Sequence, residues 1–141
     1  MNPIVLFVDD DQALLAGIRR LLQHTPFDVL IAHSVDEAQR ILASAAVQVI
    51  VSDERMPGGS GTELLQWVRE RYPHVVRIAL TGESNVERAA RLIEQGEVYR
   101  FLSKPIDRAE LLRTLERALA MRHFAEEQNR VRQSMPRKSA P

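Results

Sequence analysis

Five short apolar runs alternate along the chain with five segments that have helical periodicity, and this alternation restricts the fold more than any other feature. The first run, Ile4 to Val8, is continuous and of strand length, and apolar residues recur at helical intervals in the segment after it. The pattern then repeats four times. We expect strands at 4–8, 27–32, 47–52, 75–80 and 98–103, and helices at 11–23, 34–44, 62–71, 85–95 and from about 107 towards 124.

Local signals support several of these boundaries. Asp11 is of a residue type that commonly caps a helix N-terminus, and Ser34 with Glu37 three residues later forms a capping box. Gly96 follows the fourth helical segment and is expected to end it.

Continuous apolar strands separated by amphipathic helices are typical of a parallel sheet that is covered on both faces. Five strands are too few for a closed eight-stranded barrel, so we predict an α/β fold, an open, doubly wound (βα)5 sheet. In such sheets the functional site lies beyond the carboxyl ends of the strands, where the strand order reverses.

Bulk composition excludes several classes of function. Lysine plus arginine equals aspartate plus glutamate, 19 each, so no net charge attracts nucleic acid or an anionic membrane surface. The absence of cysteine excludes disulfides, thiol catalysis and a zinc–thiolate site. No apolar run approaches the roughly 20 residues of a membrane helix, and the N-terminal segment lacks the basic leader of a signal peptide. A cytoplasmic protein with one domain is expected.

Polar residues follow the predicted strands. Three aspartates, residues 9–11, come after the first strand, Asp53 after the third, Thr81 after the fourth and Lys104 after the fifth. Singly, each has an ordinary structural explanation as a helix cap or a turn residue. Together they would converge on one edge of the sheet, which favours a functional site.

The chemistry of this set points to phosphoryl transfer. Neighbouring carboxylates repel one another, and Mg2+, which prefers a few oxygen ligands and phosphate oxygens, would relieve that repulsion. Asp53 can act as a nucleophile and form an acyl phosphate. Thr81 and Lys104 would then donate to, or neutralise, the phosphoryl oxygens.

The motifs "FVDDD", "SDERMPGGSG", "LTG" and "FLSKP", in this order at the ends of predicted strands, resemble the receiver domain of two-component response regulators. The resemblance covers roughly residues 4–124 and implies a flavodoxin-like sheet with strand order 2-1-3-4-5. Residues 1–124 would form the receiver domain, and 125–141 an extension of the last helix followed by a flexible polar tail or linker.

The resemblance also implies a role for each site residue. Asp53 would be the phosphoacceptor, assisted by Thr81 and Lys104. The ligands of Mg2+, for which Mn2+ could substitute, would be the side chains of Asp9, Asp10 and Asp53 and the backbone carbonyl of Arg55. The peptide bond between Lys104 and Pro105 would be cis.

Four positions are implied to shape the response. Thr81 and Phe101 would form the switch. The aromatic switch residue is Phe101 and not Tyr99, because it is Phe101 that lies three residues before Lys104. Phe101 has a competing explanation as a core residue. Arg55 and Glu83 occupy the positions that tune hydrolysis of the acyl phosphate.

The implied partners are a sensor histidine kinase or phosphotransfer protein and an output domain or effector. The output partner would contact the surface formed by the fourth helix, fifth strand and fifth helix, through which a homodimer could also form. No direct contact with nucleic acid or membrane is expected. The chain would be a signalling phosphoacceptor whose only reactions are self-phosphorylation and autodephosphorylation.

One alternative belongs to a different class. Asp9 and Asp11, with Thr81 and Lys104 later in the chain, follow the order of haloacid-dehalogenase-like phosphohydrolases, in which the first aspartate is the nucleophile. That alternative leaves Asp53 and the Met-Pro-Gly segment after it unexplained.

Overall fold

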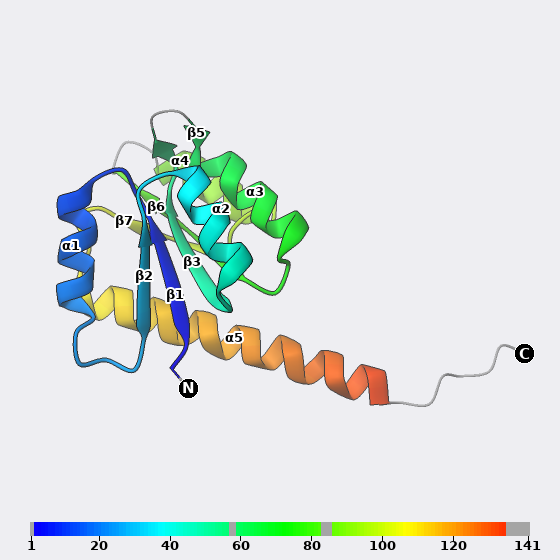
Figure 1. The fold of residues 1–141 in the computed structure, drawn as a ribbon. Helices are drawn as coiled ribbons and strands as arrows, with labels where there is room; N and C mark the ends of the chain where they lie inside the picture. Colours follow the sequence, from blue (N-terminus) through cyan, green and yellow to red (C-terminus); the bar gives the residue numbers. More distant parts are fainter. Residues whose placement is uncertain (1, 57–58, 83–85, 135–141) are drawn as a thin grey trace, which may run out of the picture.

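A computed structural model of the chain describes residues 2–56, 59–82 and 86–134. One five-stranded parallel sheet forms its centre, with helices on both faces (Figure 1). The sheet strands are β1 (Ile4–Val8), β2 (Asp28–Ala32), β3 (Val47–Asp53), β6 (Val76–Thr81) and β7 (Arg100–Ser103). The helices are α1 (Gln12–Leu21), α2 (Val35–Ser44), α3 (Gly61–Arg71), α4 (Val86–Glu94) and α5 (Arg108–Ser134).

The strand order is β2-β1-β3-β6-β7. β6 and β7 are the fourth and fifth sheet strands along the chain, so the predicted order 2-1-3-4-5 is confirmed. The order reverses between β1 and β3, because the chain passes from β1 outward to β2 and then crosses to the other side of β1.

Alternate residues of each buried strand pack against different helices. Val5 and Phe7 of β1 join the core beneath α1 and α5, whereas Leu6 and Val8 join the core beneath α2, α3 and α4. The central strands are therefore apolar on both sides, which explains why their sequences are continuous rather than alternating.

The predicted helix caps are present. The Asp11 side chain accepts a hydrogen bond from the Leu14 amide at 3.0 Å, and Ser34 Oγ accepts one from the Glu37 amide at 3.1 Å. Gly96 follows α4 with a φ of 75°, in the left-handed region that glycine adopts without steric cost.

One feature differs from the sequence-based expectation. The segment after β3, expected as a loop, contains a short antiparallel hairpin of β4 (Arg55–Met56) and β5 (Gly59–Ser60). The last helix continues past residue 124 to Ser134, because polar residues of high helix propensity extend it after its apolar face has ended. The division between a receiver domain and an extension near residue 124 stays a prediction.

Candidate functional site

Strand register explains why the polar residues meet. Val8 pairs with Ala32 on one side and with Ser52 on the other, so Asp9 and Asp53 emerge from neighbouring strands at the same level. The carboxylates of Asp9, Asp10 and Asp53 offer ligand atoms that all lie within 4.8 Å of one another. Such an all-oxygen set suits a hard divalent cation.

Lys104 provides the positive charge of this cluster. Its Nζ lies 2.9 Å from Asp9 Oδ2 and 3.6 Å from Asp53 Oδ2. The Lys104 amide donates to the Thr81 carbonyl at 2.8 Å, which fixes the end of β7 against the end of β6. The peptide bond between Lys104 and Pro105 is cis. One ammonium therefore bridges two carboxylates that would otherwise repel each other.

The electrostatics favour a proton or a cation at Asp53. Burial and, next, the charge of Asp9 raise the pKa of Asp53, and Lys104 offsets only part of this effect. Burial lowers the pKa of Lys104, but its hydrogen bond to Asp9 and the charges of Asp53 and Asp9 outweigh burial, so that pKa is raised. Lys104 therefore stays protonated, while ionised Asp53 carries a free-energy cost that a bound cation would relieve.

Thr81 and Phe101 lie on adjacent strands. Thr81 is buried at the end of β6 and its hydroxyl donates to the Gly82 carbonyl at 3.0 Å. Phe101, two residues before the Thr81 partner Ser103, is half-buried and packs against the core beneath α2, α3 and α4. A half-buried aromatic ring next to α4 fits the switch interpretation as well as the core one.

Arg55 stands beside the carboxylate cluster, and its amide donates to Asp53 Oδ1 at 3.4 Å. Its side chain is exposed. Glu83, the second predicted tuning residue, lies outside the described residues.

Residues 5–116 match the family described as the response regulator receiver domain. The chain belongs to this family. The haloacid-dehalogenase alternative is not supported, because the match spans most of the chain and includes Asp53 and the hairpin segment.

Named relatives agree with this assignment. The chain is 37% identical over 115 residues to the hydrogenase transcriptional regulatory protein HoxA of Cupriavidus necator, and this match covers 82% of the chain and 24% of HoxA. It is 33% identical over 125 residues to the DNA-binding transcriptional regulator NtrC of Salmonella typhimurium, and this match covers 89% of the chain and 26% of NtrC. The chain thus spans about a quarter of the length of these relatives.

A solved structure shows the same fold. The signal receiver domain of an HD domain-containing protein from Pseudomonas fluorescens Pf-5 superposes with a TM-score of 0.82 at 36% identity, and the match covers 89% of this chain and 93% of the other.

Glu54 is a residue of the receiver site that the sequence-based reasoning missed. The residue is 2% exposed, and neither carboxylate oxygen makes a hydrogen bond of ordinary geometry among the described residues, although the Thr81 hydroxyl is near enough to help lower its pKa. Burial raises its pKa, and the charge of Arg88 on α4 opposes that effect. The sequence signal that could have identified Glu54 is its position, because it is a charged residue directly after Asp53, between a predicted strand and a predicted turn. Glu54 and Arg88 link the edge of the site to α4.

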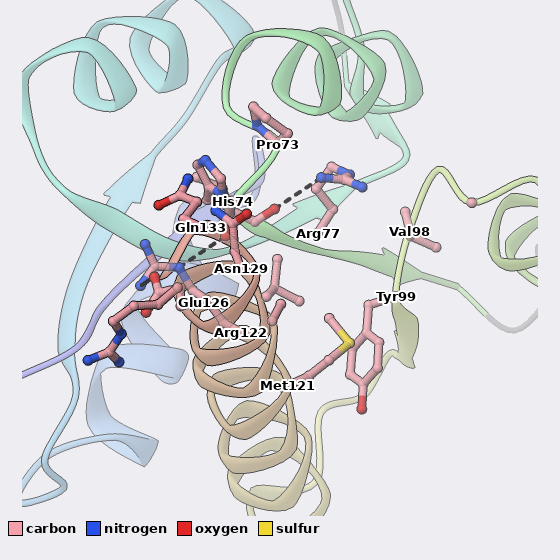
Figure 2. Close-up of a pocket in the computed structure, with 15 residues that line it drawn as sticks. Pro73, His74, Arg77, Val98, Tyr99, Met121, Arg122, Glu126, Asn129 and Gln133 are labelled. Carbon is pink, nitrogen blue, oxygen red and sulfur yellow. Dashed lines mark hydrogen bonds and ion pairs between the residues drawn. The ribbon is translucent and has the colours of Figure 1, made fainter. Parts of the chain in front are cut away.

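A hollow of the receiver domain lies far from the carboxylates. It has a volume of ≈ 740 Å³ and is formed by α5 and the segments that precede β6 and β7 (Figure 2). Because those segments lie at the amino ends of the strands, this hollow is at the opposite edge of the sheet from Asp53.

Within the described part of the chain, no helix is both long and apolar enough to cross a bilayer.

Replacing Asp53 by Asn is expected to raise the thermal stability of the metal-free receiver at pH 7 by about 2–4 °C, because a buried, repelled charge is removed. The folded-state pKa of Asp53 lies above its ordinary value of 3.8, so the folded chain binds this proton more readily than the unfolded chain. The contribution of Asp53 to wild-type stability therefore improves as the pH falls through that raised pKa. The advantage of Asp53→Asn should shrink as the pH falls towards 3.8.

Thermal unfolding in EDTA over a series of pH values measures this difference. Asp11→Asn is the matched control, because Asn also caps helices and Asp11 lies outside the carboxylate cluster. A lower stability of Asp53→Asn at pH 7 would show that the ion pair with Lys104 outweighs the cost of burial.

Proposed function

We propose that this receiver domain accepts a phosphoryl group on Asp53 and uses it to control an output partner. The supporting observation is Lys104, whose Nζ lies 2.9 Å from Asp9 and 3.6 Å from Asp53 at the edge where three carboxylates gather. An ammonium and a cation site on either side of one nucleophilic carboxylate are the groups that phosphoryl transfer requires.

In the proposed reaction, a carboxylate oxygen of Asp53 attacks the phosphorus of a phosphohistidine or a small phosphodonor. The bond between phosphorus and the donor breaks, its electron pair leaves with the donor, and a mixed anhydride forms on Asp53. Lys104 exchanges part of its contact with Asp53 for a phosphoryl oxygen. The Thr81 hydroxyl gives up its hydrogen bond to the Gly82 carbonyl and donates instead to a second phosphoryl oxygen. Water later hydrolyses the anhydride and regenerates the carboxylate.

The donor set fits Mg2+, because three carboxylates share one small volume and the pKa of Asp53 is raised by burial and by Asp9. The side chains of Asp9, Asp10 and Asp53 with the Arg55 carbonyl would hold the ion, and Mn2+ would substitute. When bound, the ion supplies positive charge that neutralises the carboxylates and the phosphoryl oxygens.

We propose that the readout surface is the one formed by α4, β7 and α5. Phe101 of β7 packs on the α4 side of the sheet, which supports the proposal that its ring moves into the volume that Thr81 leaves. Exposed Val86 and Ile93 on α4 give this surface apolar contact area. The partners would be a cytoplasmic sensor kinase or phosphotransfer protein and an output domain or effector. The two named relatives are transcriptional regulators, which favours control of transcription.

Beryllofluoride, which forms a phosphoryl-like complex with carboxylates, tests the proposal directly. Fluorine NMR with Mg2+ is expected to show a bound species in the wild-type receiver that disappears with EDTA. Asp11→Asn should bind as the wild type does. Failure of the wild-type chain to bind beryllofluoride would reject the proposed function.

The tuning residues give a separate prediction. Arg55 and Glu83, if they form an opposite-charge pair that screens the anhydride from water, should prolong the phosphorylated state. An exposed pair is worth about 0.5–1 kcal/mol, so Arg55→Ala/Glu83→Ala is expected to shorten the phosphoryl half-life by about two- to fivefold. Decay of radiolabelled protein measures this, with exposed Arg40→Ala on α2 as the control. An unchanged half-life would refute the screening role.

A further inference from the structure

The end of β3 buries an acidic side chain that the proposed reaction does not use. Glu54 is 2% exposed, and neither of its carboxylate oxygens makes a hydrogen bond of ordinary geometry among the described residues. A buried acceptor without a donor is destabilising. A donor that reaches Glu54 in another state of the domain would therefore stabilise that state.

Backbone hydrogen bonds fix the place of Glu54. Its amide donates to the Leu80 carbonyl at 3.3 Å, and its carbonyl accepts a hydrogen bond from the Gly61 amide at 3.1 Å. Leu80 comes directly before Thr81, and Gly61 begins α3. Glu54 is thus held between the end of β6 and the start of α3.

Two donors lie near the Glu54 side chain. Burial has the largest effect on its pKa and raises it, whereas the charge of Arg88 and the Thr81 hydroxyl are near enough to oppose this rise. Arg88 of α4 donates to the Thr62 hydroxyl at 3.5 Å. Because Thr62 follows Gly61, this contact holds Arg88 beside the residue that bonds the Glu54 backbone.

The Thr81 hydroxyl has a single proton to donate. In this structure the proton goes to the Gly82 carbonyl at 3.0 Å, with Glu54 close by. In the proposed reaction the proton goes to a phosphoryl oxygen instead, and the hydroxyl turns away from Glu54. Arg88 then remains as the donor on α4 that can take its place.

α4 is able to shift because few of its side chains are buried. Ala89 and Leu92 are the buried residues of this nine-residue helix. Arg88 is half-buried and precedes Ala89, so a small shift of the helix carries its guanidinium from Thr62 towards Glu54. Glu54 is already buried in this structure, so the new contact adds no desolvation cost for that carboxylate.

We propose that Glu54 is a positioning residue in a relay from Thr81 to α4, in which Arg88 donates a hydrogen bond to Glu54 once phosphorylation draws the Thr81 hydroxyl away. The new bond pulls α4 towards the end of β3. It forms whether the carboxyl group is ionised or protonated, since both forms have an oxygen that accepts a guanidinium hydrogen bond. The relay rests on the proposed function and adds a residue to it. By linkage, a contact that phosphorylation forms must in turn strengthen binding of the phosphoryl group.

Beryllofluoride titrations with Mg2+ test the relay through a double-mutant cycle. Glu54→Met, which removes both acceptors, and Arg88→Gln are each expected to weaken beryllofluoride binding about five- to tenfold. The double variant should bind no more weakly than either single variant. Glu54→Gln and Arg88→Lys keep an acceptor and a donor, and each should retain most of the affinity. Arg91→Gln removes an exposed guanidinium of α4 and should bind as the wild type does.

Proton–nitrogen NMR of the arginine Nε groups reads the contact itself. The Arg88 signal, assigned by its loss in Arg88→Gln, should shift when beryllofluoride is added to the wild type and stay in place in Glu54→Met. Thermal unfolding checks the fold, and Glu54→Met should be at least as stable as the wild type because an acceptor without a donor is removed. If Glu54→Met disturbs the end of β3, Arg88→Gln provides the same test from the side of α4.

Three results would overturn the relay while leaving the proposed function in place. They are undiminished beryllofluoride affinity in Glu54→Met, losses that add in the double variant, and an Arg88 signal that shifts equally in Glu54→Met. A wild-type chain that does not bind beryllofluoride would reject the proposed function and the relay with it.

Discussion

Asp53→Asn is expected to abolish incorporation of phosphate from acetyl phosphate in the presence of Mg2+, with no residual labelling. An amide is a far poorer nucleophile than a carboxylate, and asparagine cannot form the acyl phosphate. Replacement keeps the size of the side chain, and the metal-free variant is expected to be at least as stable as the wild type. Loss of labelling would therefore not arise from unfolding.

Neighbouring aspartates provide the controls for this experiment. Asp11→Asn changes a carboxylate two residues from Asp9 that caps α1, and it should label at the wild-type rate. Asp10→Asn removes one member of the carboxylate cluster and should label more slowly, with a higher Mg2+ requirement. Labelling of Asp53→Asn at the wild-type level would mean that another residue accepts the phosphoryl group.

Gly61→Ala is expected to cause the largest loss of stability among single substitutions near the site. A Cβ at position 61 would lie 1.6 Å from the Asp53 carbonyl oxygen and 2.7 Å from its carbonyl carbon. Those atoms belong to the backbone of a central strand, so either α3 or the end of β3 must move. Overpacking of this kind costs about 1–3 kcal/mol.

Gly17→Ala is the matched control, because it makes the same chemical change inside α1 where a Cβ meets nothing within 4 Å. Alanine there should stabilise the helix by about 0.5–1 kcal/mol. Chemical denaturation of both variants measures the two effects. Equal stability of Gly61→Ala and the wild type would show that α3 can shift away from Asp53 at little cost.

Much of the fold was predictable because each strand and helix carries its own local signal. The strand residues are apolar on both sheet faces, and Asp11, Ser34 and Gly96 mark helix ends by mechanisms that act within a few residues. The carboxylate cluster was also predictable. Parallel strands share one carboxyl edge, so Asp9 and Asp53 had to approach each other once the strand order was known.

Features that depend on contacts between distant segments were not predictable. The β4–β5 hairpin forms within a segment rich in glycine that reads as a loop, and no alternating apolar pattern marks its two-residue strands. The burial of Glu54 depends on how α3 and α4 cover the end of β3. The residue at which the extension of α5 ends, Ser134, was not predictable, because the final turns are stabilised by helix propensity and by pairs such as Arg122 with Glu126, which a search for apolar periodicity does not detect.

The central claim is that Asp53 is the nucleophile, and locating the phosphoryl group tests it most directly. Acyl phosphate formed with acetyl phosphate and Mg2+ can be reduced with borohydride, which converts the modified aspartate to homoserine, and the residue can then be identified by tandem mass spectrometry. We predict homoserine at position 53 alone. Homoserine at position 9 would contradict the assignment. So would a protein that carries labelled phosphate but yields homoserine at neither position 53 nor position 9.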